Sequence, residues 1–289
     1  MSEALTTTGE RGDRRGRIEA MLRRLRGGEL GVLPVVAGLL IIAATFQSMA
    51  PSFLSPGNIS NLTLQIVPTG LVALGLVLVL LLGEVDLSAG SVSGLCAAVM
   101  AIASVARHLD PVLAMVLAVL LGAGIGAAQG SIVARLGVPS FVVTLAGLIG
   151  WQGALLWTLG DTGTVNLPYH GAVATLANSF VRDKALAYAL AALPAALYFV
   201  ALLRAEGRRG RLGLPRRPPL AIALRAGGLL LLALAAAYVL CLTRGLPMAL
   251  LVFVGLVAIF DLALRKTRYG RMVFAVGGNA EAARRAGID

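Results

Sequence analysis

The amino-acid sequence predicts an all-α integral membrane protein that crosses the bilayer about eight times. Hydrophobic residues fill 58% of the 289 positions, charged residues fill only 13%, and the mean hydropathy is +0.86. A water-soluble domain of this size does not combine so many apolar residues with so few charges. The apolar residues also gather in long runs, and a helix needs roughly 20 of them to cross a hydrocarbon core about 30 Å thick.

Eight apolar runs are predicted to be spans, because a backbone in lipid must form its hydrogen bonds within its own segment. The first run follows seven arginines in residues 1–30, as the apolar part of a signal peptide would. It is too long for that role and no small-residue cleavage site follows it, so we expect it to be retained. The predicted spans cover residues 32–50, 66–83, 91–106, 111–134, 139–159, 185–203, 226–243 and 246–264.

The positions of Lys and Arg predict that both ends of the chain are cytoplasmic. With the N-terminus inside, 21 of the 25 basic residues fall on the inner side, in residues 1–30, 204–225 and 265–289 and at Arg135. Inner loops of membrane proteins carry such an excess. The chain is therefore expected to be a multi-pass protein of the inner-membrane type, and its charge of +11 does not indicate nucleic-acid binding. The four outer basic residues are Arg107, Arg182, Lys184 and Arg244.

Two connections between spans are long. Residues 161–184 are expected to lie along the outer surface as a short helix and turn. Residues 204–225 form a basic inner loop that Pro and Gly are expected to keep from continuing as helix. Its arginines favour anchoring near anionic lipid headgroups.

No enzymatic motif is present. Lys184 and Lys266, the only lysines, do not follow a Gly-rich phosphate loop, and neither an HExxH nor a GxSxG pattern occurs. Cys96 and Cys241 lie in apolar runs and are expected to be packing residues. His170, like His108, falls in an outer loop, where a histidine is ordinarily solvated. The chain is thus predicted to be no enzyme, with no catalytic residue, no metal site and no cofactor of its own.

Acidic residues at membrane depth are costly and point to function. Glu84 and Asp86 lie in a Gly-interrupted break, where either Asp86 or Ser88 caps the next helix or the two acids line a polar path. Asp261 is four residues before Arg265 and is expected to form a local ion pair with it.

Other polar and small residues interrupt the apolar spans. Gln129, Thr144 and Gln152 either form hydrogen bonds between helices or contact a polar solute on its way through. A stripe of small residues on the fourth span is expected to let a neighbouring helix approach closely. It consists of Gly122, Gly124, Gly126 and Gly130.

The last segment, residues 265–289, departs from the membrane pattern because it is polar. Its sequence predicts a short helix with Asn279 as N-cap, Glu281 in the first turn and Gly287 at its end. A compact, capped cytoplasmic helix after a span favours a docking role.

Three ordered segments resemble the permease subunits of bacterial ABC importers for monosaccharides, the ribose, xylose and arabinose group. GEVDLSAGS at 83–91 resembles the group's D-L-S-x-G-S signature, and LGVPSFVVTL at 136–145 resembles its second conserved segment. TRYGRMVFAVGGNAEAARRAGI at 267–288 resembles the segment that forms its cytoplasmic coupling helix. Glu84, where many relatives have glycine, and the second segment as a whole are most similar to the xylose-type branch.

The resemblance implies a permease domain over residues 31–264 and a coupling segment over residues 265–289 that fits a groove on a separate ABC ATPase subunit. ATP and Mg would be held by that ATPase. The other implied partners are a periplasmic sugar-binding protein and a second permease copy, which would form a homodimer around one path. Relatives continue with further spans, so the chain is expected to end before the family's last helices. The implied coupling residues are Gly278, Asn279, Ala282, Ala283 and Gly287.

Two other classes of function stay open. A stand-alone, ion-coupled secondary transporter needs an ionisable group at the membrane midplane, whereas Glu84, Asp86 and Asp261 all lie near span ends. A membrane-embedded enzyme needs a cluster of His, Asp or Glu that the sequence does not show.

Overall fold

The computed structural model describes residues 33–168, 171–215 and 217–288 of the chain. The chain divides into two units, residues 1–58 and residues 59–289. The predicted basic N-terminal segment and His170 lie outside the described residues.

The first unit contains helix α2 (Leu33–Met49) and a turn that leads into the next helix. The Gln47 side chain closes this turn, because its amide donates to the Pro51 carbonyl oxygen at 3.0 Å and accepts the Leu54 N–H at 2.8 Å. The rings of Phe46 and Phe53 stack with their centroids 5.3 Å apart.

Helix α3 (Pro56–Leu81) begins ten residues before the predicted span. Residues 56–65 are too polar to extend the apolar run, but they carry helix-start signals that hydropathy does not register. Proline is favoured as the first residue of a helix, and the Ser55 hydroxyl accepts the Asn58 N–H at 3.4 Å.

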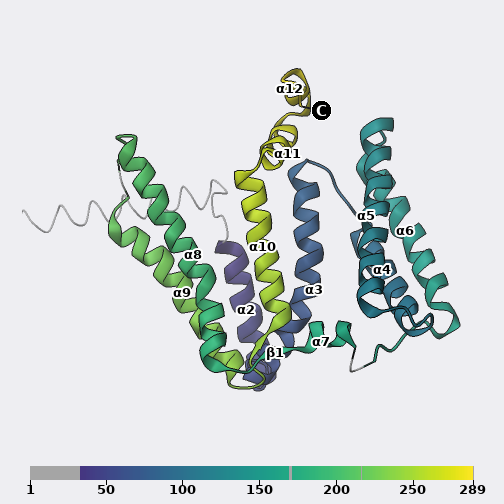
Figure 1. The fold of residues 1–289 in the computed structure, drawn as a ribbon, viewed down its shortest axis with the longest axis horizontal. Coiled ribbons are helices and arrows are strands. Elements are labelled where there is room, and N and C mark those ends of the chain that lie inside the picture. Colours follow the sequence, from purple (N-terminus) through teal and green to yellow (C-terminus); the bar gives the residue numbers. More distant parts are fainter. Residues whose placement is uncertain (1–32, 169–170, 216, 289) are drawn as a thin grey trace, which may run out of the picture. The chain divides into compact units, whose positions relative to one another are not determined.

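The other elements belong to the second unit (Figure 1). They are α4 (Ala89–Val105), α5 (Pro111–Leu136), α6 (Ser140–Leu159), η1 (Gly160–Thr162), α7 (Ala172–Asn178), β1 (Phe180–Val181), α8 (Lys184–Arg211), α9 (Pro219–Cys241), β2 (Leu246–Pro247), α10 (Met248–Lys266), α11 (Arg268–Gly278) and α12 (Ala280–Arg285). The two short strands pair antiparallel. Helix α7 confirms the short helix expected within residues 161–184.

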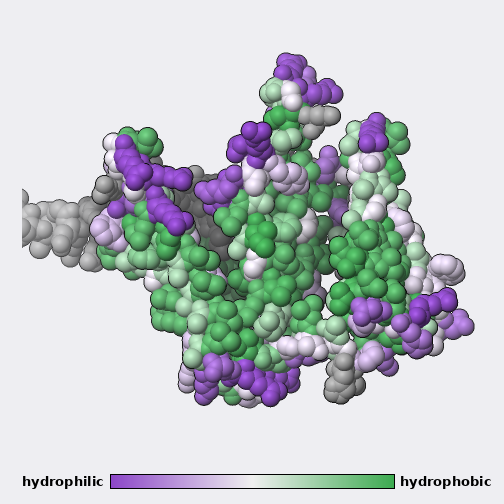
Figure 2. Space-filling view, in the orientation of Figure 1, coloured by the Kyte–Doolittle hydropathy of each residue, from purple (hydrophilic) through white to green (hydrophobic). Residues whose placement is uncertain are grey.

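The all-α, multi-pass membrane class is confirmed. Each predicted span coincides with a helix, and six helices within the described residues are long and apolar enough to cross a membrane. The other two, α2 and α4, have 17 residues each and reach only about 25 Å at 1.5 Å per residue. Eight crossings therefore stay a prediction. Figure 2 shows hydrophobic residues along the helix flanks and hydrophilic residues gathered at the α8–α9 turn and α12.

Small residues bring α4 against α5 and α6. A side chain at Gly94 would come within 3.1 Å of Leu155, and one at Gly122 within 3.3 Å of the Cys96 sulfur. Close approach through small residues is how membrane helices pack. The predicted stripe is confirmed at Gly122, and Cys96 is a packing residue as expected. The stripe prediction was wrong for Gly124, Gly126 and Gly130, which have open space on their side-chain faces.

Helices α8 and α9 pack against each other as a hairpin. Its core contains Ala187, Leu240 and Leu246, and the partly buried Cys241 packs on this cluster. The expected packing role of Cys241 is confirmed.

The basic loop predicted over residues 204–225 is much shorter in the structure. Helix α8 continues to Arg211 and α9 begins at Pro219, so only seven residues connect them. Arginine is a good helix former, and Gly207 and Gly210 are tolerated inside α8. Pro219 stands at the start of α9, where proline is favoured.

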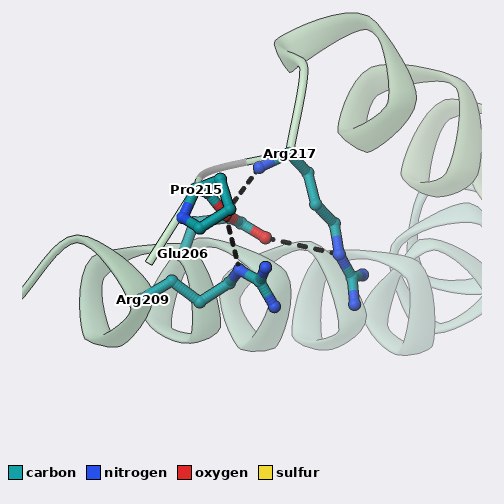
Figure 3. A network of polar contacts seen from close by, with 4 residues as sticks. All are labelled: Glu206, Arg209, Pro215 and Arg217. Atoms are coloured by element: carbon teal, nitrogen blue, oxygen red, sulfur yellow. Dashed lines mark hydrogen bonds and ion pairs between the residues drawn. The ribbon is translucent and has the colours of Figure 1, made fainter. Parts of the chain in front are cut away.

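A buried carboxylate holds this short turn together (Figure 3). Glu206 is only 8% exposed, and it accepts the Arg217 N–H at 3.0 Å. The guanidinium of Arg217 lies 3.6 Å from the carboxylate, and that of Arg209 lies 3.9 Å away. Arg209 also donates to the Pro215 carbonyl oxygen at 3.0 Å. Glu206 thus fixes the turn in which the arginines gather.

Candidate functional site

The break between α3 and α4 is folded by its own side chains. The Asp86 carboxylate accepts both the Ser88 N–H and the Ser88 hydroxyl, each at 2.7 Å. Ser88 occupies the N-cap position of α4, but its side chain accepts no hydrogen bond from the helix. The prediction that Asp86 or Ser88 caps this helix was therefore wrong. The two side chains bond to each other in a local turn, which competes with capping.

Helix α6 secures the middle of the break. The Val85 N–H donates to the Ser140 hydroxyl at 3.2 Å, and the Thr144 hydroxyl lies 3.1 Å from the Val85 carbonyl oxygen. Thr144 is only 5% exposed and also lies 2.9 Å from the Ser140 carbonyl oxygen. Non-helical backbone leaves N–H and carbonyl groups without partners in its own segment, and α6 supplies partners for them here. Both polar backbone groups of Val85 are satisfied by α6.

Helix α5 reaches the break through Gln129. Its amide nitrogen donates to the Ser88 hydroxyl at 3.2 Å, and that hydroxyl in turn donates to Asp86. Gly147 on α6 makes room for this contact, because a side chain there would overlap the Gln129 amide and approach the Ser88 Cβ to 3.3 Å. The expected hydrogen bonding between helices is confirmed for Gln129, which reaches the N-cap residue of α4, whereas Thr144 bonds to the break and to its own helix.

These elements surround a cavity of about 430 Å³, a size typical of small-molecule sites. Four of the five predicted path residues line it, together with residues of α3 and with Val276 of α11. Those four are Glu84, Asp86, Gln129 and Thr144. The fifth, Gln152, is exposed on α6 and does not line the cavity. Gly126 and Gly130 of the predicted stripe border this cavity.

The cavity offers carboxylate, amide and hydroxyl groups on a mostly apolar wall. Such a set can accept and donate hydrogen bonds to a neutral solute rich in hydroxyl groups. No group of three His, Cys, Asp or Glu side chains gathers here or elsewhere in the described part of the chain.

The predicted ends of the last helix, α12, are confirmed. The Asn279 side chain accepts the Ala282 N–H at 2.9 Å, and Glu281 in the first turn pairs with Arg285 at 2.6 Å. Gly287 has a φ of +81° and follows the helix, and the Ile288 N–H donates back to the Ala283 carbonyl oxygen at 3.0 Å. This is a Schellman ending, in which glycine provides the left-handed turn.

Four of the five residues implied to couple to an ATPase lie in α12 or at its ends, and the fifth, Gly278, is the last residue of α11. Asn279 and Gly287 form its two ends, and Ala283 is buried with 5% exposure. Gly278 and Ala282 are exposed. Asn279, Ala283 and Gly287 therefore shape the helix, and every coupling residue except Ala283 is exposed.

A second cavity, of about 700 Å³, lies beside the paired strands β1 and β2. Three of the four basic residues predicted to face outward line it: Arg182, Lys184 and Arg244. The Arg244 guanidinium lies 5.9 Å from the centre of the Phe180 ring, within the range of a cation–π contact. This cavity concentrates positive charge.

Two remaining sequence predictions are settled by geometry. Asp261 and Arg265 pair at 2.6 Å, as expected from their spacing. His108 is exposed in the connection between α4 and α5, as expected of a solvated histidine.

The long apolar helices define this molecule as a multi-pass membrane protein. The family model described as branched-chain amino acid transport system / permease component matches residues 58–289, and the chain belongs to this family.

Individual relatives are named as sugar permeases. The xylose transport system permease protein XylH of Escherichia coli (strain K12) is 32% identical over 266 residues, which are 92% of this chain and 67% of the relative. XylH of Haemophilus influenzae is 33% identical over 269 residues, covering 92% and 70%. The ribose import permease protein RbsC of Bacillus subtilis is 36% identical over 125 residues, covering 43% and 38%. No solved structure gives a significant match.

Proposed function

We propose that this chain is the permease subunit of an ATP-driven importer for xylose or a related monosaccharide. The observation that carries the proposal is the cavity of the α3–α4 break, where residues from α5, α6 and α11 converge on Glu84 and Asp86. The similarity to xylose permeases over 92% of the chain supports the sugar class.

Within this cavity the polar groups have separate roles. Thr144 and Ser88 are engaged with backbone or neighbouring side chains and hold the wall in place. Glu84 and the second N–H of the Gln129 amide, whose first N–H donates to Ser88, are the groups we assign to sugar hydroxyls on the path. Gln152 is exposed in this structure, so we assign it to the path only in another conformation of the transporter.

Energy comes from a separate ABC ATPase that holds ATP and Mg, since no enzymatic motif occurs in this sequence. The exposed Gly278 and Ala282 of the coupling segment meet that ATPase. A second copy of the permease forms a homodimer around the path, which the family resemblance supports.

The N-terminus is cytoplasmic in this proposal, which the count of basic residues supports. The arginines around Glu206 then face the inner leaflet, where anionic lipids attract them. The cavity lined by Arg182, Lys184 and Arg244 faces outward. Its charge suits an acidic surface on the periplasmic sugar-binding protein.

Co-purification tests the ATPase partnership. Wild-type permease, expressed with its candidate ATPase, is expected to bring the ATPase through detergent purification. Ala282→Arg places a long charged side chain on the exposed face of α12 and is expected to abolish this association. Ala205→Arg is the matched control, since Ala205 is also exposed but lies on α8.

An ATPase that never binds the wild type, or that binds Ala282→Arg equally well, would contradict the coupling role. A stand-alone secondary transporter would then become the better account, and uptake should follow an imposed ion gradient without ATP.

A further inference from the structure

The end of α11 lies beside the end of α3 (Figure 1). Gly277, near the end of α11, brings its backbone directly against the Leu81 backbone. A Cβ atom at this position would overlap the Leu81 carbonyl oxygen, lie 2.9 Å from the Leu81 carbonyl carbon and lie 3.4 Å from the Leu82 Cα. The neighbouring Gly278 has open space on its side-chain face. Only glycine fits at position 277 without displacing one of the two helices.

The contact lies at the entrance to the acidic break. Leu81 is the last residue of α3, and hydrogen-bonded turns continue from it to Glu84. The Gly83 N–H donates to Leu80 at 3.0 Å, and the Glu84 N–H donates to Val79 at 3.2 Å. A displacement of Leu81 is therefore carried along a short, bonded stretch of chain to Glu84.

Beyond Glu84 the break is tied to the other walls of the cavity. Val85 is bonded to α6 through Ser140 and Thr144, and Asp86 is linked to α5 through Ser88 and Gln129. On the α11 side, Val276 lines the same cavity directly before Gly277. The coupling segment and the cavity are thus joined by one continuous set of contacts.

We propose that Gly277 is the positioning residue through which movement of the coupling segment reaches the cavity. Backbone pressed on backbone transmits a displacement, because no flexible side chain lies between the helices to absorb it. The end of α11 therefore moves the end of α3, and the Glu84–Asp86 wall moves with it. This inference rests on the proposed ATP-driven function.

The experiment compares Gly277→Ala with wild type in the complete complex of permease, ATPase and sugar-binding protein in proteoliposomes. ATPase association, ATP hydrolysis and D-xylose uptake are measured on the same preparations. We expect Gly277→Ala to keep ATPase association and basal hydrolysis within about twofold, while xylose uptake per ATP falls about tenfold or more.

Gly75→Ala is the matched control. It makes the same change in the middle of α3, where the added methyl group meets nothing within 4 Å. It should leave uptake per ATP within about twofold of wild type, although both variants gain the same intrinsic helix propensity.

A second variant, Thr144→Val, perturbs the same set of contacts without adding volume to a packed site. Thr144→Val keeps the side-chain shape but removes the hydroxyl that reaches Val85. It should lower uptake per ATP with little change in the xylose concentration for half-maximal uptake. The double variant with Gly277→Ala should be about as impaired as the more affected single variant, because residues of one network are not additive.

The possible results distinguish the proposed role of Gly277 from the proposed function of the whole chain. If wild type takes up xylose with ATP but Gly277→Ala does so equally well, the inference is overturned and the proposed function stands. Loss of ATPase association in Gly277→Ala would also overturn it, because Gly277 would then serve docking. If wild type itself never uses ATP for uptake, both proposals fail.

Discussion

Removing the Glu206 carboxylate should open the turn between α8 and α9. Glu206→Ala deletes the acceptor of the Arg217 N–H at 3.0 Å and two ion pairs at 3.6 and 3.9 Å. A hydrogen bond to a charged acceptor contributes about 1.5–3 kcal/mol. Because both arginine side chains are more than a third exposed, each ion pair adds at most about 1 kcal/mol.

The total is about 2 kcal/mol or more, which raises the population of the open turn about thirtyfold. Trypsin cleavage in detergent is the assay, because proteolysis follows the open population when closing is fast. Cleavage after Arg208, Arg209 or Arg211 should accelerate by about that factor. Glu206→Gln keeps a neutral acceptor and should give a smaller effect, about fivefold.

Glu281→Ala serves as the control. It removes an exposed ion pair with Arg285, so it should leave cleavage in the α8–α9 turn unchanged. If Glu206→Ala is cleaved at the wild-type rate, the buried carboxylate does not hold the turn and this reasoning is refuted.

Three further predictions concern the cavities. Gly147→Ala should cost about 1 kcal/mol of stability, because its methyl group displaces the Gln129 amide from its hydrogen bond with Ser88. Thermal unfolding in detergent checks this against Gly150→Ala, which has open space and should not be destabilised. Asp86→Ala removes the acceptor of both Ser88 hydrogen bonds, so xylose uptake should fall at least about tenfold while the ATPase still co-purifies; normal uptake would argue against the cavity. Arg244→Glu should weaken capture of the sugar-binding protein most at low salt, as pull-downs across a salt series would show; equal capture at every salt concentration would rule out this face.

The sequence was sufficient to locate the helices, because each run of apolar residues has to be helical in lipid. It was less able to locate their ends. Helix α8 extends eight residues past the predicted boundary at residue 203, since hydropathy marks where the apolar run ends and not where the helix does. At α12, by contrast, Asn279 and Gly287 are specific end signals, and both predicted ends are confirmed.

The candidate site, like the helices, was only partly predictable from the sequence. Glu84, Asp86, Gln129 and Thr144 could be selected from the sequence, because polar groups are rare and costly in apolar helices. Their hydrogen-bond partners could not be predicted from the sequence, because Asp86 bonds to Ser88 rather than to the helix that follows it.

Two glycines at close contacts in this structure could not be identified from the sequence. Gly147 and Gly277 act by what their missing side chains allow to approach, and only the fold shows which backbone or side chain lies there. In the sequence, Gly277 and Gly278 form an indistinguishable pair.

The most direct test of the central claim is sugar accumulation in proteoliposomes that hold the permease with its ATPase and sugar-binding protein. The proposed function predicts that D-xylose or a related monosaccharide accumulates only when ATP and Mg are supplied on the ATPase side. Accumulation driven by an ion gradient, with the permease alone and no ATP, would contradict it.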